Sequence, residues 1–330
     1  MTTGTTLPGY VDSASLRRLR LSVGRRLDGL LQGEHLTPLP GPGGEPAEAR
    51  PYSPGDDVRR IDWAATARTL QTHVRATSAD RELEAWVVSD LSASMDFGTV
   101  RWEKRDLGLA TVAAVAHLTE GPGNRLGGVL LSAAPGGTPL LVPARGGRDG
   151  QLALLRSIAA APRATAGAAV PSLAQGLSRL ERPVRRRGLV VVVSDLIGDP
   201  GHWESPLRRL GSRHDVVVTE IRDPRELQLP AVGVLRVVDP ETGRAIEVQT
   251  RSVRLRQRYA AAALARRAEV AAAVRRAGAG HVVLATDRDW VVDLARFVAS
   301  RRRLRGATRH VLHGPHGPGP QRPGLQRAGA

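Results

Sequence analysis

The chain has 330 residues, of which 41% are hydrophobic and 24% are charged, and its formal net charge is +16. It contains no cysteine, which excludes disulfide scaffolds, thiolate nucleophiles, zinc fingers and iron–sulfur clusters and leaves oxygen and imidazole as metal ligands. Only 3% of the residues are aromatic, too few for a surface that stacks many bases, so we expect no specific nucleic-acid binding despite the positive charge.

The first 83 residues are predicted to form an N-terminal helix and a small β-rich region. Leucines recur at helical spacing over residues 15–31, with arginines between them, which is the pattern of an amphipathic helix. Residues 37–51 are dense in proline and glycine, and residues 52–63 alternate turn chemistry with short extended pieces. The first ten residues lack the basic and apolar segments of a secretory signal, so we expect a cytoplasmic protein.

Residues 84–305 show the alternating strands and helices of an α/β domain. The predicted strands are short apolar runs at 85–89, 125–132, 140–142, 189–194, 215–221 and 281–285. Their alternation with helical patterns predicts a doubly wound, mostly parallel sheet. Residues 232–249 interrupt the alternation with two extended stretches around a turn, which predicts a β-hairpin insertion. No apolar run approaches the length of a bilayer span, so we expect no integral membrane segment.

The end of the chain, residues 306–330, has the proline, glycine, arginine and histidine composition of a disordered tail. From Ser300 onward there are seven arginines and no acidic residue. We interpret this basic end as a source of non-specific contacts with anionic surfaces.

The strongest chemical signal is a carboxylate and two hydroxyls at alternating positions, Asp90, Ser92 and Ser94, where a buried strand ends. Open parallel sheets bind ligands at the carboxyl ends of their strands, and Mg²⁺ prefers hard oxygen ligands of this kind. Asp195 ends a second strand and converges with Asp90 if the two strands are neighbours. The alternative is that these residues only cap the next helix, which is a common role of Asp and Ser.

This pattern resembles the metal-ion-dependent adhesion site of the von Willebrand factor A fold. The D-x-S-x-S motif of that site matches Asp90, Ser92 and Ser94, and its strand-four aspartate matches Asp195. The resemblance implies a Mg²⁺ or Mn²⁺ ion held by the first three residues and contacted by Asp195 directly or through water. A threonine that the fold normally supplies from a third loop is missing here, and Ser172 is the available hydroxyl.

A second resemblance starts at residues 50–63, which read RPYSPGDDVRRIDW. Together with D-x-S-x-S, this segment is similar to the signature of the bacterial family called domain of unknown function fifty-eight, and the resemblance covers most of residues 30–305. Such proteins are typically encoded beside an AAA+ ATPase of the MoxR type, which the resemblance implies as a partner.

Residues 52–63 allow two interpretations from their own chemistry. One is a turn braced by arginine–aspartate pairs, with Trp63 anchored in the core. The other is a partner-docking surface formed by Arg59, Arg60, Asp62 and Trp63.

The sequence contains none of the common catalytic motifs. We find no Walker motif, no Gly-x-Ser-x-Gly and no His-Glu-x-x-His. We therefore favour a non-catalytic protein-interaction module with a Mg²⁺-dependent adhesion-type site, acting with a MoxR-type ATPase in the assembly or maturation of a complex. The alternative is a metal-dependent hydrolase that uses the same residues, although no general base is evident beside them.

Overall fold

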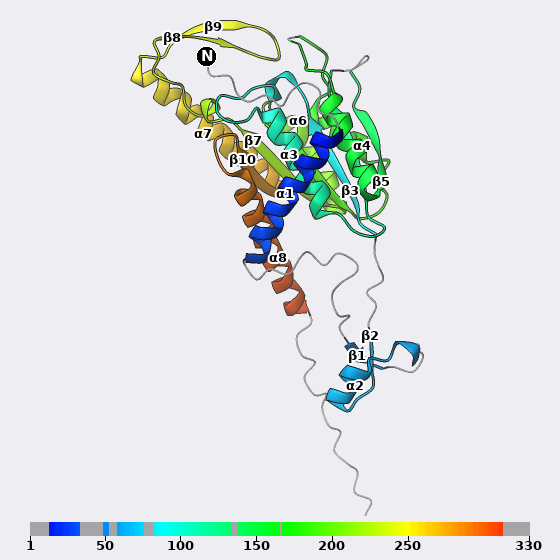
Figure 1. The fold of residues 1–330 in the computed structure, drawn as a ribbon. Helices are drawn as coiled ribbons and strands as arrows, with labels where there is room; N and C mark the ends of the chain where they lie inside the picture. The colour runs from blue at the N-terminus through cyan, green and yellow to red at the C-terminus, as the bar shows by residue number, and fades with distance from the viewer. Residues whose placement is uncertain are drawn as a thin grey trace, which may run out of the picture.

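The computed structural model describes most of the chain, namely residues 13–33, 49–52, 58–75, 82–133, 137–165 and 167–312. A six-stranded sheet forms its centre (Figure 1). The strands are β3 (Glu84–Asp90), β4 (Arg125–Leu131), β5 (Leu140–Gly146), β6 (Leu189–Ser194), β7 (Asp215–Arg222) and β10 (Gly280–Ala285). Their order is β10-β7-β6-β3-β4-β5, and every neighbouring pair is parallel except β4 and β5. The predicted doubly wound α/β fold is confirmed.

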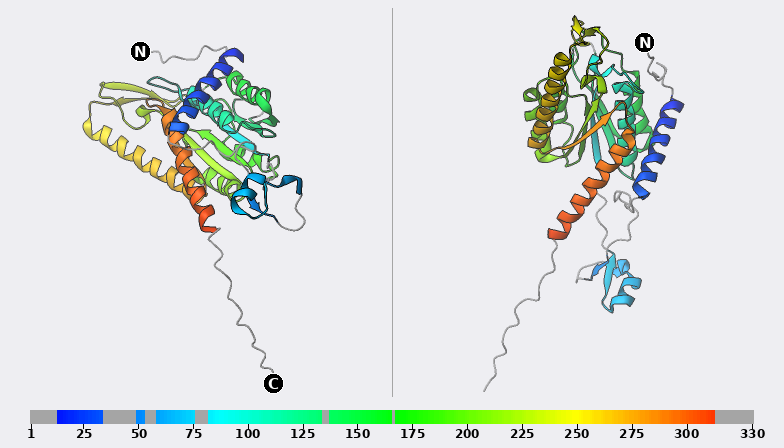
Figure 2. Two further views of the ribbon diagram at one scale, coloured as in Figure 1. Left: turned by 60° about the horizontal axis from the view of Figure 1, so that its bottom comes forward. Right: turned by 90° about the vertical axis from the view of Figure 1, so that its left-hand side faces the viewer.

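The central strands are buried on both faces, which explains their continuous apolar sequences. In β3, Ala85 and Val87 face one layer of helices, while Trp86 and Val88 face the other. The helices of the first layer are α1 (Ser13–Gly33), α3 (Lys104–Leu118), α4 (Gly147–Ala160) and α8 (Trp290–Leu312). Those of the second are α5 (Leu173–Leu180), α6 (Pro200–Arg213) and α7 (Val253–Arg276). Figure 2 shows α1 and α7 on opposite sides of the sheet.

The N-terminal helix α1 belongs to the α/β domain and not to the small β-rich region with which the sequence grouped it. Leu16 and Leu27 of this helix are fully buried in the same core cluster as the residues of α3. Burying each such leucine contributes about 1.5–3 kcal/mol to stability. The sequence pattern predicted the helix but did not indicate the surface that its apolar stripe covers.

A small unit contains the segment for which the sequence allowed two interpretations. Strand β1 (Ala49–Pro51) pairs antiparallel with β2 (His73–Arg75), and the short helices η1 (Val58–Arg60) and α2 (Trp63–Thr69) lie between them in the chain. Asp62 caps α2 by accepting hydrogen bonds from the N–H groups of Ala64 and Ala65. This cap starts the helix at Trp63, whose side chain is 72% exposed, while Ala65 turns inward. The interpretation of Trp63 as a core anchor is therefore wrong.

A β-hairpin stands between β7 and α7 in the chain. Its strands β8 (Val234–Val238) and β9 (Ala245–Gln249) pair antiparallel and form a separate two-stranded sheet. The insertion therefore forms the hairpin that its turn signal predicted.

Helix α8 continues past Gly306, where the sequence predicted that the tail begins. The segment up to Leu312 has no proline, and the first proline after the helix is Pro315, so nothing in the sequence stops the helix at 306. The rest of the predicted tail, 313–330, lies outside the described residues. In the part of the chain that the structure describes, no helix has both the length and the apolar character needed to cross a membrane.

Candidate functional site

The candidate site lies where the strand order of the sheet reverses. Strand β3 pairs with β4 on one side and with β6 on the other, and the chain winds outward from these strands in both directions. Such a switch point is where open α/β sheets bind ligands. Asp90 is the last residue of β3, and Asp195 directly follows β6. The parallel pairing of β3 with β6 brings the two carboxylates to the same edge of the sheet.

Local hydrogen bonds fix the carboxylate of Asp90. Its Oδ1 accepts a hydrogen bond of 3.0 Å from the N–H of Ser92, and its Oδ2 accepts one of 2.7 Å from the hydroxyl of Ser194. Burial and the negative charge of Asp195 raise the pKa of Asp90 to about 6, although the hydrogen bonds from Ser194 and Ser92 act in the opposite direction. Two carboxylates thus repel each other at the strand ends, and a positive charge placed beside Asp90 would be stabilised.

The donor set around Asp90 fits a small divalent cation. Ser94 is buried and Ser92 is partly buried, and their hydroxyls form a hydrogen bond with an Oγ–Oγ distance of 3.1 Å. Neighbouring ligands in an octahedral Mg²⁺ shell are separated by about 3.0 Å, given metal–oxygen bonds of about 2.1 Å. Among the described residues, no group of three or more His, Cys, Asp or Glu side chains forms a candidate metal cluster. Asp90, Ser92 and Ser94 would therefore hold a cation through hydroxyls as well as a carboxylate.

Asp195 has a different partner from the one that the sequence suggested. Its Oδ2 accepts a hydrogen bond of 2.7 Å from the Nζ of Lys104, and its Oδ1 accepts one from the N–H of Ile197. The Lys104 side chain is 1% exposed and also forms an ion pair with Glu226. Burial alone would lower the pKa of Lys104, but the charges of Asp195 and Glu226 outweigh it and raise that pKa. Lys104 is therefore a permanent positive charge, and it holds the carboxylate that the resemblance assigned to the ion.

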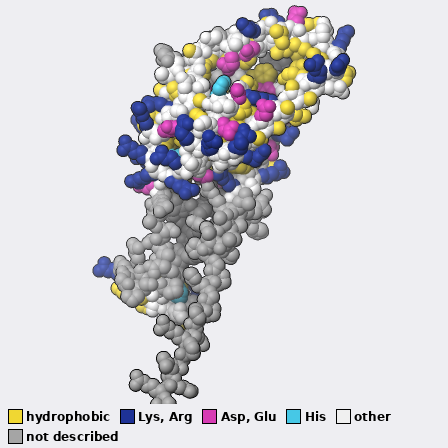
Figure 3. All heavy atoms as spheres, turned by 180° about the vertical axis from the view of Figure 1, so that it is seen from behind, with side chains coloured by type: hydrophobic (Ala, Val, Ile, Leu, Met, Phe, Trp, Pro, Cys, Tyr) yellow, Lys and Arg dark blue, Asp and Glu magenta, His cyan; other side chains and the backbone are white. Residues whose placement is uncertain are grey.

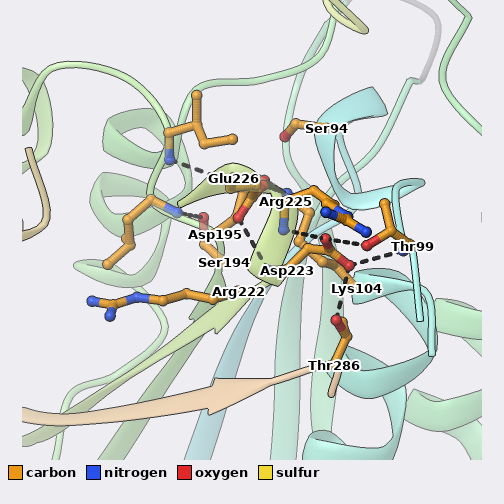
Figure 4. Close-up of polar contacts among 12 residues, drawn as sticks. Ser94, Thr99, Lys104, Ser194, Asp195, Arg222, Asp223, Arg225, Glu226 and Thr286 are labelled. Atoms are coloured by element: carbon orange, nitrogen blue, oxygen red, sulfur yellow. Dashed lines mark hydrogen bonds and ion pairs between the residues drawn. The ribbon is translucent and has the colours of Figure 1, made fainter. Parts of the chain in front are cut away.

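A network of charges extends from this ion pair across the ends of β6 and β7. Arg267 of α7 contacts Glu226 and the fully buried Glu220, which also accepts hydrogen bonds from Arg222 and His281. Burial favours a raised pKa for Glu220, but the hydrogen bonds from His281 and Arg222 and the charges of Arg222 and Arg267 lower it to about 2. Figure 4 shows Asp195, Lys104 and Glu226 together above the strand ends. The network stabilises the edge of the sheet that carries the site.

A buried aspartate anchors the loop that follows the Asp90 motif. Asp223, at the end of β7, accepts hydrogen bonds from the N–H and the hydroxyl of Thr99 at 2.9 and 2.6 Å. It accepts a third, of 2.9 Å, from the hydroxyl of Thr286 at the end of β10 (Figure 4). Three segments are thus joined at one carboxylate, and the loop that carries Ser92 and Ser94 is held against the sheet.

The hairpin contributes a carboxylate to the same place. Glu241, in the turn between β8 and β9, accepts a hydrogen bond of 3.0 Å from the N–H of Ser94 through its Oε1. The carbonyl of Glu241 accepts another, of 2.8 Å, from the N–H of Gly167. The structure therefore brings a third carboxylate beside the Asp90 motif, from a turn 147 residues away in the chain.

The remaining predicted residues lie elsewhere. Ser172 is exposed and caps α5, where its hydroxyl accepts a hydrogen bond from the N–H of Gln175. Arg59, Asp62 and Trp63 belong to the small unit, and the side chain of Arg60 lies outside the described part.

Sequence reasoning missed Lys104 and Glu241 as members of the site. Lys104 carries a signal that could have found it, because it is the only lysine in a chain whose other basic residues, apart from histidine, are arginines. Glu241 carries a weaker one, as one of two acidic residues in the turn of an inserted hairpin. In both cases the contact depends on long-range packing.

The family follows from comparison with known sequences. The sequence model of the family described as "Protein of unknown function DUF58" matches residues 48–269. The chain belongs to this DUF58 family. One relative, "Uncharacterized protein Rv1480" from Mycobacterium tuberculosis, is 51% identical over 291 residues, which cover 88% of this chain and 90% of the relative. "Uncharacterized protein MAV169" from Mycobacterium avium is 46% identical over 162 residues, covering 49% of this chain and 94% of that protein.

Solved structures similar to this DUF58 chain include von Willebrand factor A proteins. BatB from Bacteroides thetaiotaomicron is 12% identical with a TM-score of 0.44, covering 67% of this chain and 99% of its own. A von Willebrand factor type A protein from Catenulispora acidiphila is 13% identical with a TM-score of 0.33. The match covers 66% of this chain and 42% of that chain. Proximal thread matrix protein 1 from the mussel byssus, in its structure with a zinc-occupied MIDAS motif, is 14% identical with a TM-score of 0.29. The match covers 42% of this chain and 36% of that chain.

Proposed function

We propose that this protein is a non-catalytic interaction module that docks a carboxylate of a partner onto a Mg²⁺ or Mn²⁺ ion at the ends of β3 and β6. The observation that supports this most directly is the donor set of Asp90, Ser92 and Ser94, with its two hydroxyls 3.1 Å apart at the switch point of the sheet. Asp195 would act from the next strand end, through water, because Lys104 occupies its Oδ2. Ser172 could take part only if its cap of α5 opened.

Asp90, Ser92 and Ser94 have separate roles in this proposal. Asp90 supplies negative charge, and its own hydrogen bonds with Ser92 and Ser194 keep its orientation fixed before anything binds. Ser92 and Ser94 supply neutral oxygens, so the chain contributes little net charge to the ion. A divalent cation bound there keeps exchangeable waters, and a partner's Asp or Glu replaces one of them with a charge-assisted contact.

The alternative, a metal-dependent hydrolase, needs a group that accepts a proton beside the ion. Lys104 cannot accept that proton, because its raised pKa keeps it protonated between Asp195 and Glu226. The carboxylate of Glu241 is already engaged by the N–H of Ser94, so we favour binding without catalysis.

The resemblance of the sequence to its family suggests the partner, a MoxR-type AAA+ ATPase in the cytoplasm. The small unit offers a second docking surface, because Trp63 is exposed beside Asp62 and Arg59. An exposed tryptophan is a residue type that commonly dominates the binding energy of an interface.

Capture of the recombinant ATPase by the immobilised protein tests the proposal. We expect Mg²⁺ to support the complex, and both a chelator and Asp90→Asn to weaken it at least several-fold. Asp149→Asn, the same change at an exposed position in the first turn of α4, is the matched control and should have no effect. If neither the chelator nor Asp90→Asn weakens the capture of the ATPase, the site is not the docking surface.

A further inference from the structure

Hydrogen bonds within the turn of the hairpin hold Glu241 in one orientation. Asp239 accepts hydrogen bonds from the N–H of Glu241 at 3.0 Å and from the hydroxyl of Thr242 at 2.5 Å. The N–H of Gly243, which has a φ of 72° that favours glycine, donates to the carbonyl of Asp239. These bonds close the turn on itself, so the Glu241 side chain reaches the site from a rigid support.

Most of the hairpin is otherwise exposed. Apolar side chains that would normally be covered lie open along it, namely Val232, Val234, Val238 and Ile246. In the rear view of Figure 3, hydrophobic side chains gather along the edge formed by the hairpin and α7. The base is held by the buried Thr250, which bonds to Val232 and Gly233, while the turn reaches the domain through Glu241. The side chain and carbonyl of Glu241 therefore attach the free end of the hairpin to the domain.

The carboxylate of Glu241 lies close to the proposed cation ligands. Its carboxylate is next to Ser94, whose hydroxyl lies 3.1 Å from that of Ser92, and Asp90 and Asp195 follow at the adjacent strand ends. The positive charge of Lys104 is already shared between Asp195 and Glu226. A cation held by Asp90, Ser92 and Ser94 would therefore attract the carboxylate of Glu241, which lies next to Ser94.

We propose that Glu241 is an internal carboxylate ligand of the cation site, so that the hairpin closes the site in the absence of a partner. This inference rests on the proposed function and adds its regulation. The acidic residue of a partner takes the place of Glu241, and the hairpin then releases from Ser94 and Gly167. The cation strengthens closure because it attracts the negative charge of the Glu241 carboxylate.

Amide hydrogen exchange and Mn²⁺ calorimetry on the full chain test this inference together. In the wild-type protein, Mn²⁺ should slow exchange at residues 239–244 at least several-fold. Glu241→Gln should abolish that protection and weaken Mn²⁺ binding at least about tenfold, because loss of even a group that only supports the metal ligands costs about 10- to 100-fold in metal affinity. Glu247→Gln is the matched control, because it removes an equal charge from an exposed position in β9 of the same hairpin. It should behave as the wild-type protein does.

The two proposals fail in different ways. If Asp90→Asn leaves Mn²⁺ binding unchanged, the proposed function is wrong. If Asp90→Asn abolishes Mn²⁺ binding but Glu241→Gln retains wild-type affinity and wild-type protection of the turn, the site holds the ion without Glu241, and the internal-ligand inference is overturned.

Discussion

Replacing Lys104 by methionine removes the buried positive charge beside the site while retaining most of the volume of the side chain. Its Nζ lies 2.7 Å from Oδ2 of Asp195, and the side chains of the two residues are 1% and 2% exposed. Glu226 keeps its contact with Arg267 in the variant, but Asp195 loses its ion-pair partner. Removing one partner of a buried pair costs about 3–5 kcal/mol, because the other charge remains desolvated. We therefore expect Lys104→Met to lower the free energy of unfolding by about 3–5 kcal/mol without added metal.

Urea denaturation with and without Mg²⁺ measures this effect. Because the variant releases Asp195 for the cation, Mg²⁺ should recover more stability in Lys104→Met than in the wild-type protein. For scale, a ligand at one hundred times its Kd stabilises a protein by about 2.7 kcal/mol. Arg266→Met, which removes an exposed pair with Glu269, is the control and should cost no more than about 1 kcal/mol. A loss below about 1 kcal/mol for Lys104→Met would refute the reasoning about the buried pair.

Two further predictions concern acid stability and the small unit. Glu220 has a folded-state pKa of about 2 against an ordinary value of 4.5, so it contributes stability above pH 4.5 that is lost as the pH falls toward 2, up to about 3 kcal/mol. Urea unfolding at pH 6 and pH 3 should show a smaller difference for Glu220→Gln than for the wild-type protein, and an equal difference would contradict the assignment. Trp63→Ala should change stability by less than about 0.5 kcal/mol because the side chain is 72% exposed. It should reduce capture of the ATPase, and a large destabilisation together with normal capture would indicate a structural role instead.

The sequence predicted the parts of the fold that depend on local pattern. The runs that became β3 and β6 are apolar because both of their faces are buried, and this property is visible in a single segment. The position of Asp90 at a strand end followed in the same way. Its proximity to Asp195 required only that the two strands be neighbours, which the parallel pairing of β3 with β6 satisfies.

The contacts that the sequence could not predict join segments far apart in the chain. Lys104 meets Asp195 across 91 residues, and Glu241 meets Ser94 across 147. Each pairing depends on how a helix or a hairpin packs against the sheet. Trp63 illustrates a different limit, because a large aromatic residue suggests a core position by its size alone. Here the cap at Asp62 makes α2 begin at Trp63, and the side chain of Trp63 is exposed.

Calorimetric titration of Mn²⁺ into the metal-free full-length protein tests the central claim, that Asp90, Ser92 and Ser94 form a cation site. We predict saturable binding of one ion, abolished by Asp90→Asn and unchanged by Asp149→Asn. Absence of saturable binding at millimolar Mn²⁺, or binding that Asp90→Asn leaves intact, would contradict it.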